Sequence, residues 1–310
     1  TSHIYASFFG VYEMANQEQM DLIKSGEGFI AALDQSGGST PKALGAYGIE
    51  SSAYASEAEM YNLIHEMRAR ISRSPNFTGK KVIGAILFED TMDREFGGKQ
   101  APTYLWQQRG VVPFLKVDKG LLDNADHVQL MRPMPGLDAL LIRAKNLAVF
   151  GTKMRSVIHA ANHNGIRKIV EQQFKVGAQI TAHGLVPILE PEIIITISDK
   201  KEAETILHAS LLEALDKLPS NQIVILKLTL PEVDNHYYEL CQHPRVLSVM
   251  ALSGGYSRSE AIARLAKNTS MIASFSRALT EGLTAQQSDA EFDQALSQTI
   301  DGIYQASISG

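Results

Sequence analysis

The sequence contains a single cysteine, Cys241, so it can form no intrachain disulfide and no metal site built from several thiolates. No apolar run approaches the ~20 residues that a transmembrane helix needs, and no signal peptide is recognisable at the start. Charges of the two signs nearly balance, with a formal net charge of -5, so no basic surface is indicated. We therefore expect a soluble protein of a reducing compartment that binds neither nucleic acid nor membrane.

The 310 residues are 45% hydrophobic, which is enough for a large buried core and excludes a disordered or fibrous chain. At about 150 residues per domain the length would suggest two domains. However, α/β barrels of this size commonly form one domain, and no linker or low-complexity stretch interrupts the sequence. We predict one domain over residues 1–310.

Short apolar runs rich in β-branched residues recur along the whole chain. Such near-continuous apolar runs are typical of strands that are buried on both faces, as in a parallel sheet. We predict eight strands: Phe29–Asp34, Val82–Glu89, Val111–Asp118, Val149–Arg155, Leu185–Glu192, Ile223–Thr229, Val246–Ser253 and Met271–Arg277.

The segments between these runs have helical periodicity and helix-start signals. Ser198-Asp199 begins one helix, and the capping boxes at Ser257/Glu260 and Ser288/Glu291 begin two more. A further helix is expected over Tyr12–Lys24, before the first strand. Eight strand–helix units predict an α/β fold, a (β/α)8 TIM barrel with an extra N-terminal helix. An open, doubly wound sheet is the alternative.

Nearly every predicted strand ends in polar or ionisable residues. In a (β/α)8 barrel the carboxyl ends of the strands form the active site. Residues i and i+2 of a strand share a face, so the chain holds three same-face charged pairs: Lys116 with Asp118, Lys153 with Arg155, and Glu190 with Glu192. The outer face of a barrel is covered by helices, where such pairs would be costly, so we expect them inside the mouth. The alternative is that these charges only mark where strands reach solvent.

Lys227 lies within an apolar strand, Ile223–Leu228, where an aliphatic residue is expected. Burial and neighbouring cations such as Lys116 and Lys153 would favour its neutral amine. A neutral amine in a pocket attacks a carbonyl and forms an imine, which makes Lys227 a candidate nucleophile. The alternative is a lysine whose amine extends from the strand end into water.

Two glycine-rich loops follow predicted strands: Ser36-Gly37-Gly38-Ser39-Thr40 after the first and Ser253-Gly254-Gly255-Tyr256-Ser257 after the seventh. Glycine lets backbone N–H groups turn toward an anion, and serine adds hydroxyl donors. Barrels often bind phosphate with the loops after strands seven and eight, and Arg277 is expected on the eighth strand. Two anion sites at one mouth favour a substrate that is phosphorylated at both ends, although Gly-Gly alone is usually only a turn.

These strand-end motifs resemble those of class I fructose-bisphosphate aldolase, and most closely its short bacterial branch. The motifs follow the order of that family from Gly28 to Ala306: Ala31-Ala32-Leu33-Asp34, Leu115-Lys116-Val117-Asp118-Lys119-Gly120, Lys153-Met154-Arg155, Val186-Pro187-Ile188-Leu189-Glu190-Pro191-Glu192, Leu226-Lys227, Leu252-Ser253-Gly254-Gly255 and Ser276-Arg277-Ala278-Leu279. The resemblance implies a cytoplasmic glycolytic enzyme that cleaves fructose-1,6-bisphosphate reversibly to dihydroxyacetone phosphate and glyceraldehyde 3-phosphate. It also implies that no metal or other cofactor is needed, and a homo-oligomer, either dimer or tetramer.

The resemblance also implies roles for individual residues. Lys227 matches the Schiff-base lysine, Glu190 the main proton-transfer carboxylate with Glu192 beside it, Asp34 the carboxylate that handles the C4 hydroxyl, and Lys153 the lysine that assists imine chemistry. The residues that match the two phosphate sites are Ser253, Gly254, Gly255, Ser276 and Arg277 on one side, and Ser36, Ser39, Lys116 and Arg155 on the other.

The sequence departs from the animal enzymes of that family at several positions. They have Glu where Gln35 stands, Trp where Met154 stands and Lys-Pro-Asn where Lys227-Leu228-Thr229 stands, and they carry a long C-terminal tail ending in a proton-transferring tyrosine. The group that exchanges the enamine proton is therefore left open. Two other functions remain as alternatives: another Schiff-base barrel enzyme, such as a transaldolase or a deoxy-sugar aldolase, and a non-catalytic phosphosugar-binding protein.

Overall fold

The structure, a computed structural model, describes residues 16–309 and contains one large sheet at its centre. Eight parallel strands follow one another in chain order, and each pairs with the next. They are β1 (Phe29–Leu33), β2 (Val82–Leu87), β5 (Val112–Lys116), β7 (Gly151–Ile158), β8 (Val186–Ile193), β9 (Val224–Thr229), β10 (Val246–Leu252) and β11 (Met271–Ala273). The Ala32 N–H donates a hydrogen bond of 3.2 Å to the Phe275 carbonyl, which brings β1 back beside the chain that follows β11 and nearly closes the barrel.

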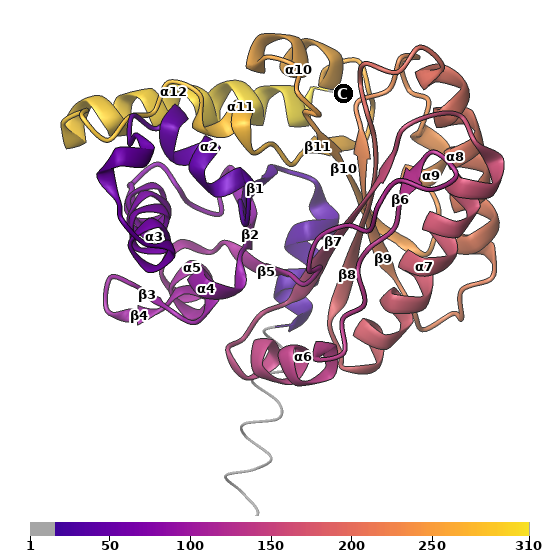
Figure 1. Cartoon of the computed structure of the whole chain (residues 1–310), viewed down its shortest axis with the longest axis horizontal. Helices are drawn as coiled ribbons and strands as arrows, with labels where there is room; N and C mark the ends of the chain where they lie inside the picture. The colour runs from indigo at the N-terminus through magenta and orange to yellow at the C-terminus, as the bar shows by residue number, and fades with distance from the viewer. Residues whose placement is uncertain (1–15, 310) are drawn as a thin grey trace, which may run out of the picture.

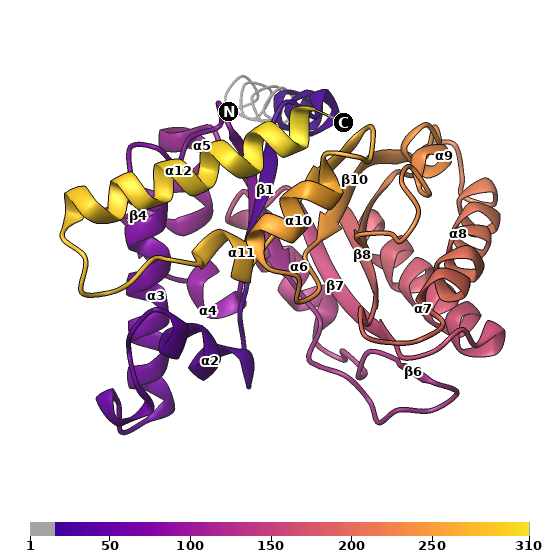
Figure 2. The ribbon, with the colours of Figure 1, turned by 90° about the horizontal axis from the view of Figure 1, so that it is seen from above.

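Helices surround this barrel, as Figure 1 and Figure 2 show from two directions. The long α7 and α8 pack beside β7 and β8, and α12 lies across the barrel near β11 and β1. Among residues 16–309, no helix is both long and apolar enough to cross a membrane. The helices are α2 (Ser39–Ala46), η1 (Ser51–Ala53), α3 (Glu57–Arg73), α4 (Glu89–Met92), α5 (Ala101–Arg109), α6 (Leu137–Asn146), α7 (His163–Ala182), α8 (Lys200–Asp216), α9 (Tyr238–Cys241), α10 (Arg258–Leu265), α11 (Arg277–Thr280) and α12 (Asp289–Ile308).

The predicted (β/α)8 barrel is confirmed, and each predicted strand overlaps one observed strand, although β7 and β8 extend past the predicted ends to Ile158 and Ile193. The prediction was wrong at the end of the last strand, because β11 stops at Ala273 and Arg277 is the first residue of α11. Ser276 adopts a helical backbone conformation there, so the chain turns before it reaches Arg277.

Helix starts follow the sequence signals closely. Asp199 is the N-cap of α8, and the Ser288/Glu291 capping box is complete at the start of α12. At α10 only half of the predicted box forms, since the Ser257 side chain accepts from the Glu260 N–H without a return bond. Part of the helix predicted over Tyr12–Lys24 lies outside the described residues, while residues 16–25 are helical and Gly26 follows with a φ of +66°.

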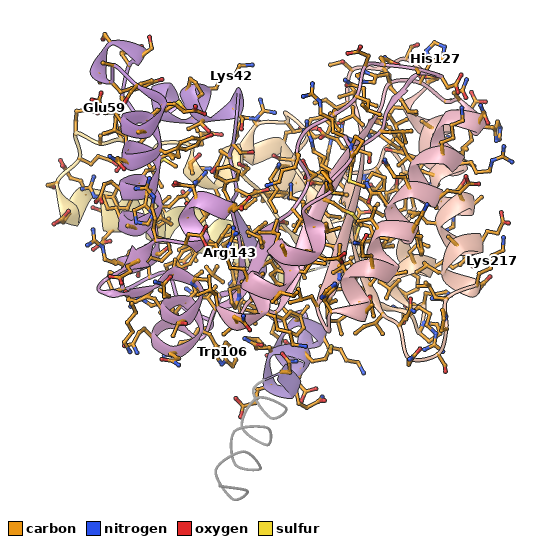
Figure 3. The ribbon with its side chains drawn as sticks, turned by 60° about the horizontal axis from the view of Figure 1, so that its bottom comes forward. Lys42, Glu59, Trp106, His127, Arg143 and Lys217 are labelled. Atoms are coloured by element: carbon orange, nitrogen blue, oxygen red, sulfur yellow. The ribbon has the colours of Figure 1, made fainter. Side chains whose placement is uncertain are left out.

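The barrel interior is filled with apolar side chains at the end where the strands begin. Alternate residues such as Ile30, Phe114, Ile188 and Ile225 form this inner cluster, and Ile23 of the helix over residues 16–25 joins it. Trp106, labelled in Figure 3 beside that helix, packs against the same cluster. Because this end is closed by apolar packing, polar side chains inside the barrel can reach solvent only at the opposite end.

Three short strands were not predicted. β3 (Glu95–Phe96) and β4 (Lys99–Gln100) form a small antiparallel hairpin, and β6 (Val128–Gln129) pairs antiparallel with the end of β7. Each has only two residues, which is too short for an alternating apolar pattern to be recognised. They lie in the long segments after β2 and β5.

Candidate active site

Four charged side chains meet inside the barrel, just beyond the apolar cluster. They are Asp34 after β1, Lys153 of β7, Glu190 of β8 and Lys227 of β9, and none is more than 8% exposed. Nζ of Lys227 lies 3.1 Å from Oε1 of Glu190. Nζ of Lys153 lies 2.9 Å from Oε2 of Glu190 and 2.7 Å from Oδ2 of Asp34. Two cations thus balance two anions, which makes burial of the group tolerable.

The strand register explains why Glu190 and Lys227 meet. Leu189 lies opposite Leu226 in the β8–β9 pair, so the next residues of the two strands, Glu190 and Lys227, lie side by side. Their neighbours Leu189 and Leu226 face the helices as part of the outer core. The alternation of a strand therefore directs both charged side chains inward.

The mutual attraction of these charges outweighs their burial. Burial raises the pKa of Asp34, but the nearby ammonium groups of Lys153 and Lys227 lower it more, to about 2. Burial likewise raises the pKa of Glu190, and Lys153 and Lys227 again bring it below its usual range. Burial lowers the pKa of Lys153, but Asp34 and Glu190 raise it above its ordinary value. At neutral pH Lys153 is therefore a fixed cation between two carboxylates.

A second set of charges lies closer to the solvent. Lys116 donates to Asp118 Oδ1 at 2.8 Å, and Arg155 pairs with Glu192 Oε2 at 2.8 Å. The Arg155 N–H also donates to Asp118 Oδ2, at 3.2 Å. Lys116 and Asp118 were predicted to share a face, and the structure joins them as an ion pair. Burial, opposed by Arg155, raises the pKa of Glu192.

The loop after β10 fits the predicted anion cradle. Gly254 and Gly255 have φ values of +60° and +111°, which residues other than glycine rarely adopt. A methyl group on Gly254 would lie 2.8 Å from Ile195 Cγ2, and one on Gly255 would lie 3.4 Å from Arg277 Nη2. The backbone of this loop, the buried Ser253 and the exposed Arg277 therefore lie together at the mouth.

The loop after β1 differs from the expected cradle. The Ser39 hydroxyl donates to the Ser36 carbonyl at 2.8 Å and accepts from the Ser36 N–H at 2.9 Å. Ser39 is also the first residue of α2, so these bonds join the loop to the start of that helix. These hydrogen bonds occupy the Ser36 N–H and the Ser39 hydroxyl, so an anion that binds here would have to replace the bond between these two groups.

The sequence did not reveal a second network behind Asp34. The fully buried Arg68 of α3 donates to the Gln35 carbonyl and, at 2.8 Å, to Thr91 Oγ1. Gln35 Nε2 in turn donates to Ser276 Oγ at 2.7 Å, so Ser276 is bonded across the seam between β1 and β11. This contact holds the residue after Asp34 and the residue before Arg277 at a fixed separation.

Ser274 is a further side chain that the sequence analysis missed. It is 1% exposed, and its Oγ has no hydrogen-bond partner within the part of the chain that the structure describes. Ile272, two residues earlier, belongs to the inner cluster, so alternation directs Ser274 into the barrel as well. The period-2 pattern of the strand could have revealed it.

This arrangement suits imine chemistry. It offers an amine on a rigid strand, a carboxylate within hydrogen-bond distance of that amine, and a second carboxylate held by a permanent cation. Within residues 16–309, no group of three or more His, Cys, Asp or Glu side chains is placed to hold a metal ion.

Comparisons with known proteins agree with this chemistry. A family model described as fructose-bisphosphate aldolase class-I matches residues 13–234. A relative from Synechocystis sp. named "Fructose-bisphosphate aldolase class 1" is 58% identical over 95% of this chain and 98% of its own length. The chain belongs to the class I fructose-bisphosphate aldolases.

Other relatives extend this result. The aldolase of the same name from Porphyromonas gingivalis is 56% identical, over 94% of this chain and 99% of its own. A crystal structure of fructose-bisphosphate aldolase from Plasmodium falciparum superposes with a TM-score of 0.76, covering 95% of both chains. That pair is only 19% identical, so it supports the fold alone. As a class I aldolase of glycolysis, this enzyme cleaves fructose-1,6-bisphosphate reversibly through a Schiff base.

Proposed function

We propose that Lys227 is the lysine that forms the Schiff base, with Glu190 as its proton-transfer partner. The observation that carries this proposal is the 3.1 Å contact between Nζ of Lys227 and Oε1 of Glu190 inside the buried mouth. Glu190 accepts a proton from the ammonium group, and the free amine adds to the C2 carbonyl to form a carbinolamine. Glu190 then returns a proton to the C2 hydroxyl, which leaves as water.

Asp34 carries out the cleavage step. The protonated imine at C2 is an electron sink, and Asp34 takes the proton of the C4 hydroxyl as the C3–C4 bond breaks toward that sink. Its low pKa keeps it ionised and ready to accept this proton, while Lys153 holds it in place at 2.7 Å. Lys153 also assists the imine chemistry through Glu190, and Glu192 lies one step closer to the mouth on the same face of β8.

The two phosphate groups bind on opposite sides of this centre. Ser253, Gly254, Gly255, Ser276 and Arg277 form one site, where the Arg277 guanidinium lies beside Gly255. Ser36, Ser39, Lys116 and Arg155 form the other. Because Lys116 and Arg155 are each paired with a carboxylate, the second phosphate competes with Asp118 and Glu192 for them.

Borohydride trapping tests the central assignment. Reduction in the presence of dihydroxyacetone phosphate should attach the ligand covalently to Lys227, which peptide mapping by mass spectrometry would locate. The Lys227→Arg variant keeps the positive charge and should give no adduct. Attachment to another lysine, or none in the wild-type protein, would refute the assignment.

Two further measurements address the substrate and the cofactor. A substrate panel should show faster cleavage of fructose-1,6-bisphosphate than of a sugar with one phosphate; the opposite ranking would favour a transaldolase or a deoxy-sugar aldolase. Activity should survive treatment with EDTA, and loss of activity with recovery on addition of zinc would contradict a cofactor-free mechanism.

We also infer three properties from the resemblance to the family. The whole chain, 1–310, acts as a single catalytic domain, it works in the cytoplasm, and it assembles as a homodimer or homotetramer. Sedimentation velocity across a range of protein concentrations would test the assembly, and a purely monomeric species would refute it.

A further inference from the structure

A cluster of charged side chains lies outside the catalytic centre, behind the phosphate loop that follows β10. Its base is the pair of Lys200 and Glu204 in α8, which are 3% and 1% exposed. Nζ of Lys200 lies 2.5 Å from Glu204 Oε1 and donates to the Leu230 carbonyl at 2.8 Å. A buried pair with this many satisfied bonds is a rigid anchor.

This pair holds the loop that follows the Schiff-base strand. Glu204 Oε2 accepts from the Glu232 N–H at 3.0 Å, and the Glu232 side chain lies 3.1 Å from Nζ of Lys200. Leu230 and Glu232 come directly after β9, whose last residue is Thr229. The position of Glu232 is therefore tied through a short, hydrogen-bonded segment to the strand that carries Lys227.

From this loop a contact reaches the phosphate loop. The Tyr256 hydroxyl donates to Glu232 Oε1 at 3.3 Å, and Tyr256 is the residue directly after Gly255. The Tyr256 N–H also donates to the Ser253 carbonyl at 3.0 Å, which closes the turn. The Arg264 guanidinium lies 4.4 Å from the centre of the Tyr256 ring and restricts it from the other side.

We propose that the Glu232–Tyr256 hydrogen bond is a positioning contact that fixes the phosphate loop relative to Lys227. Gly254 and Gly255 have no side chains of their own to anchor the loop, so its N–H groups need an external support to stay aimed at an anion. The contact connects the loop to the neighbouring strand, and it thereby sets the separation between the imine nitrogen and the bound phosphate. Neither residue belongs to the set proposed to bind the phosphate groups. This inference rests on the proposed function.

The test is a comparison of KM and kcat for fructose-1,6-bisphosphate. Tyr256→Phe keeps the ring beside Arg264 and removes only the hydroxyl, and Glu232→Ala removes the acceptor. Tyr256→Phe should raise KM about fivefold, the effect of one lost hydrogen bond, with kcat within about twofold. Glu232→Ala should raise KM at least as much, because it also removes the Glu232 contacts with Lys200 at 3.1 Å and Arg264 at 3.8 Å. The KM of the double variant should equal that of Glu232→Ala, with no further rise of about fivefold, because the Tyr256 hydroxyl has already lost its acceptor.

Two controls separate positioning from general stability. Glu232→Gln keeps an acceptor for Tyr256 and should restore KM to within about twofold of wild type. Glu260→Gln removes the other carboxylate that binds Arg264, at 2.7 Å on the same helix, and should leave KM unchanged. The rate of borohydride trapping with unphosphorylated dihydroxyacetone should be equal in all variants, because that ligand has no phosphate.

The outcomes distinguish this inference from the proposed function. Suppose that wild type is trapped at Lys227. If KM is then unchanged in Tyr256→Phe and Glu232→Ala, or if their effects on KM multiply in the double variant, the positioning contact is wrong and the Schiff-base assignment stands. If a variant slows dihydroxyacetone trapping by the same factor by which it raises KM, the positioning contact is also wrong, because the substitution then distorts the whole site. Failure to trap wild type at Lys227 would instead overturn the proposed function.

Discussion

The Lys153 side chain reaches across the inside of the barrel to Asp34, and the two charged atoms lie 2.7 Å apart. Their strands, β7 and β1, are not neighbours, because β2 and β5 lie between them in the sheet. The ion pair therefore spans the mouth instead of following a strand edge. It also shares Lys153 with Glu190, so one cation supports both carboxylates.

Removal of this cation should be costly. In Lys153→Met, Asp34 and Glu190 stay buried without it, and breaking a buried pair typically costs about 3 kcal/mol or more of unfolding free energy. Urea denaturation measures this loss. Lys217→Met breaks an exposed pair with Glu213, at the outer edge of the molecule in Figure 3, and should change stability by no more than about 0.5 kcal/mol. Equal losses in the two variants would contradict the role of Lys153.

The amide variant of Glu190 should separate binding from proton transfer. Glu190→Gln preserves the shape of the side chain and a hydrogen bond to Lys227, but it cannot exchange protons. Imine formation should slow by at least about 100-fold, as expected for loss of a general acid–base group. A single-turnover experiment quenched with borohydride measures the rate directly. An imine rate close to that of wild type would assign proton transfer to another group.

Gly254 should not tolerate a side chain. In Gly254→Ala the new methyl group would meet Ile195 Cγ2 at 2.8 Å, in a backbone conformation with φ of +60°. We expect KM for fructose-1,6-bisphosphate to rise at least about tenfold, since the strain of about 1–2 kcal/mol falls on the phosphate loop. Gly302→Ala in α12, where the nearest atom lies at 3.5 Å, is the matched control. Gly302→Ala should leave KM unchanged, and a rise in KM equal to that of Gly254→Ala would contradict this explanation.

Stability should depend on pH through Asp34. The pKa of Asp34 in the fold is about 2, against 3.8 for its ordinary value, so the ionised form stabilises the fold above pH 3.8. This contribution, of the order of 2 kcal/mol, is lost as the pH falls from 3.8 toward 2. Between pH 6 and pH 3 wild type should lose about 1 kcal/mol more than Asp34→Asn. Chemical denaturation of both proteins at each pH measures this difference. If the unfolding free energies of wild type and Asp34→Asn fall in parallel with pH, the prediction is contradicted.

The sequence alone predicted the strands and their order well. Each strand is buried on both faces, so its apolar run is continuous up to the first charged residue, which is Lys116 at the end of β5 and Glu190 within β8. The prediction failed where local geometry ended a strand early. β11 stops at Ala273 because the chain turns into a short helix at Arg277, and no apolar pattern marks that change.

The sequence also indicated the candidate site, because barrel topology brings all carboxyl strand ends to one mouth. It placed Lys116 on the same face as Asp118, and these two residues do pair. It could not predict which charges pair across different strands, as Lys153 does with Asp34 and Glu190. The Gln35–Ser276 and Glu232–Tyr256 contacts were also hidden, since each joins residues from different loops.

What the sequence determined by itself is the set of chemical groups and the strand from which each one extends, because side-chain alternation and apolar periodicity are local properties. What only the tertiary structure decided is which atoms meet. Lys153 lies between Asp34 and Glu190 because barrel curvature and the stagger of the strands bring non-neighbouring strands within reach. That curvature is a property of the closed sheet as a whole, and no single segment encodes it.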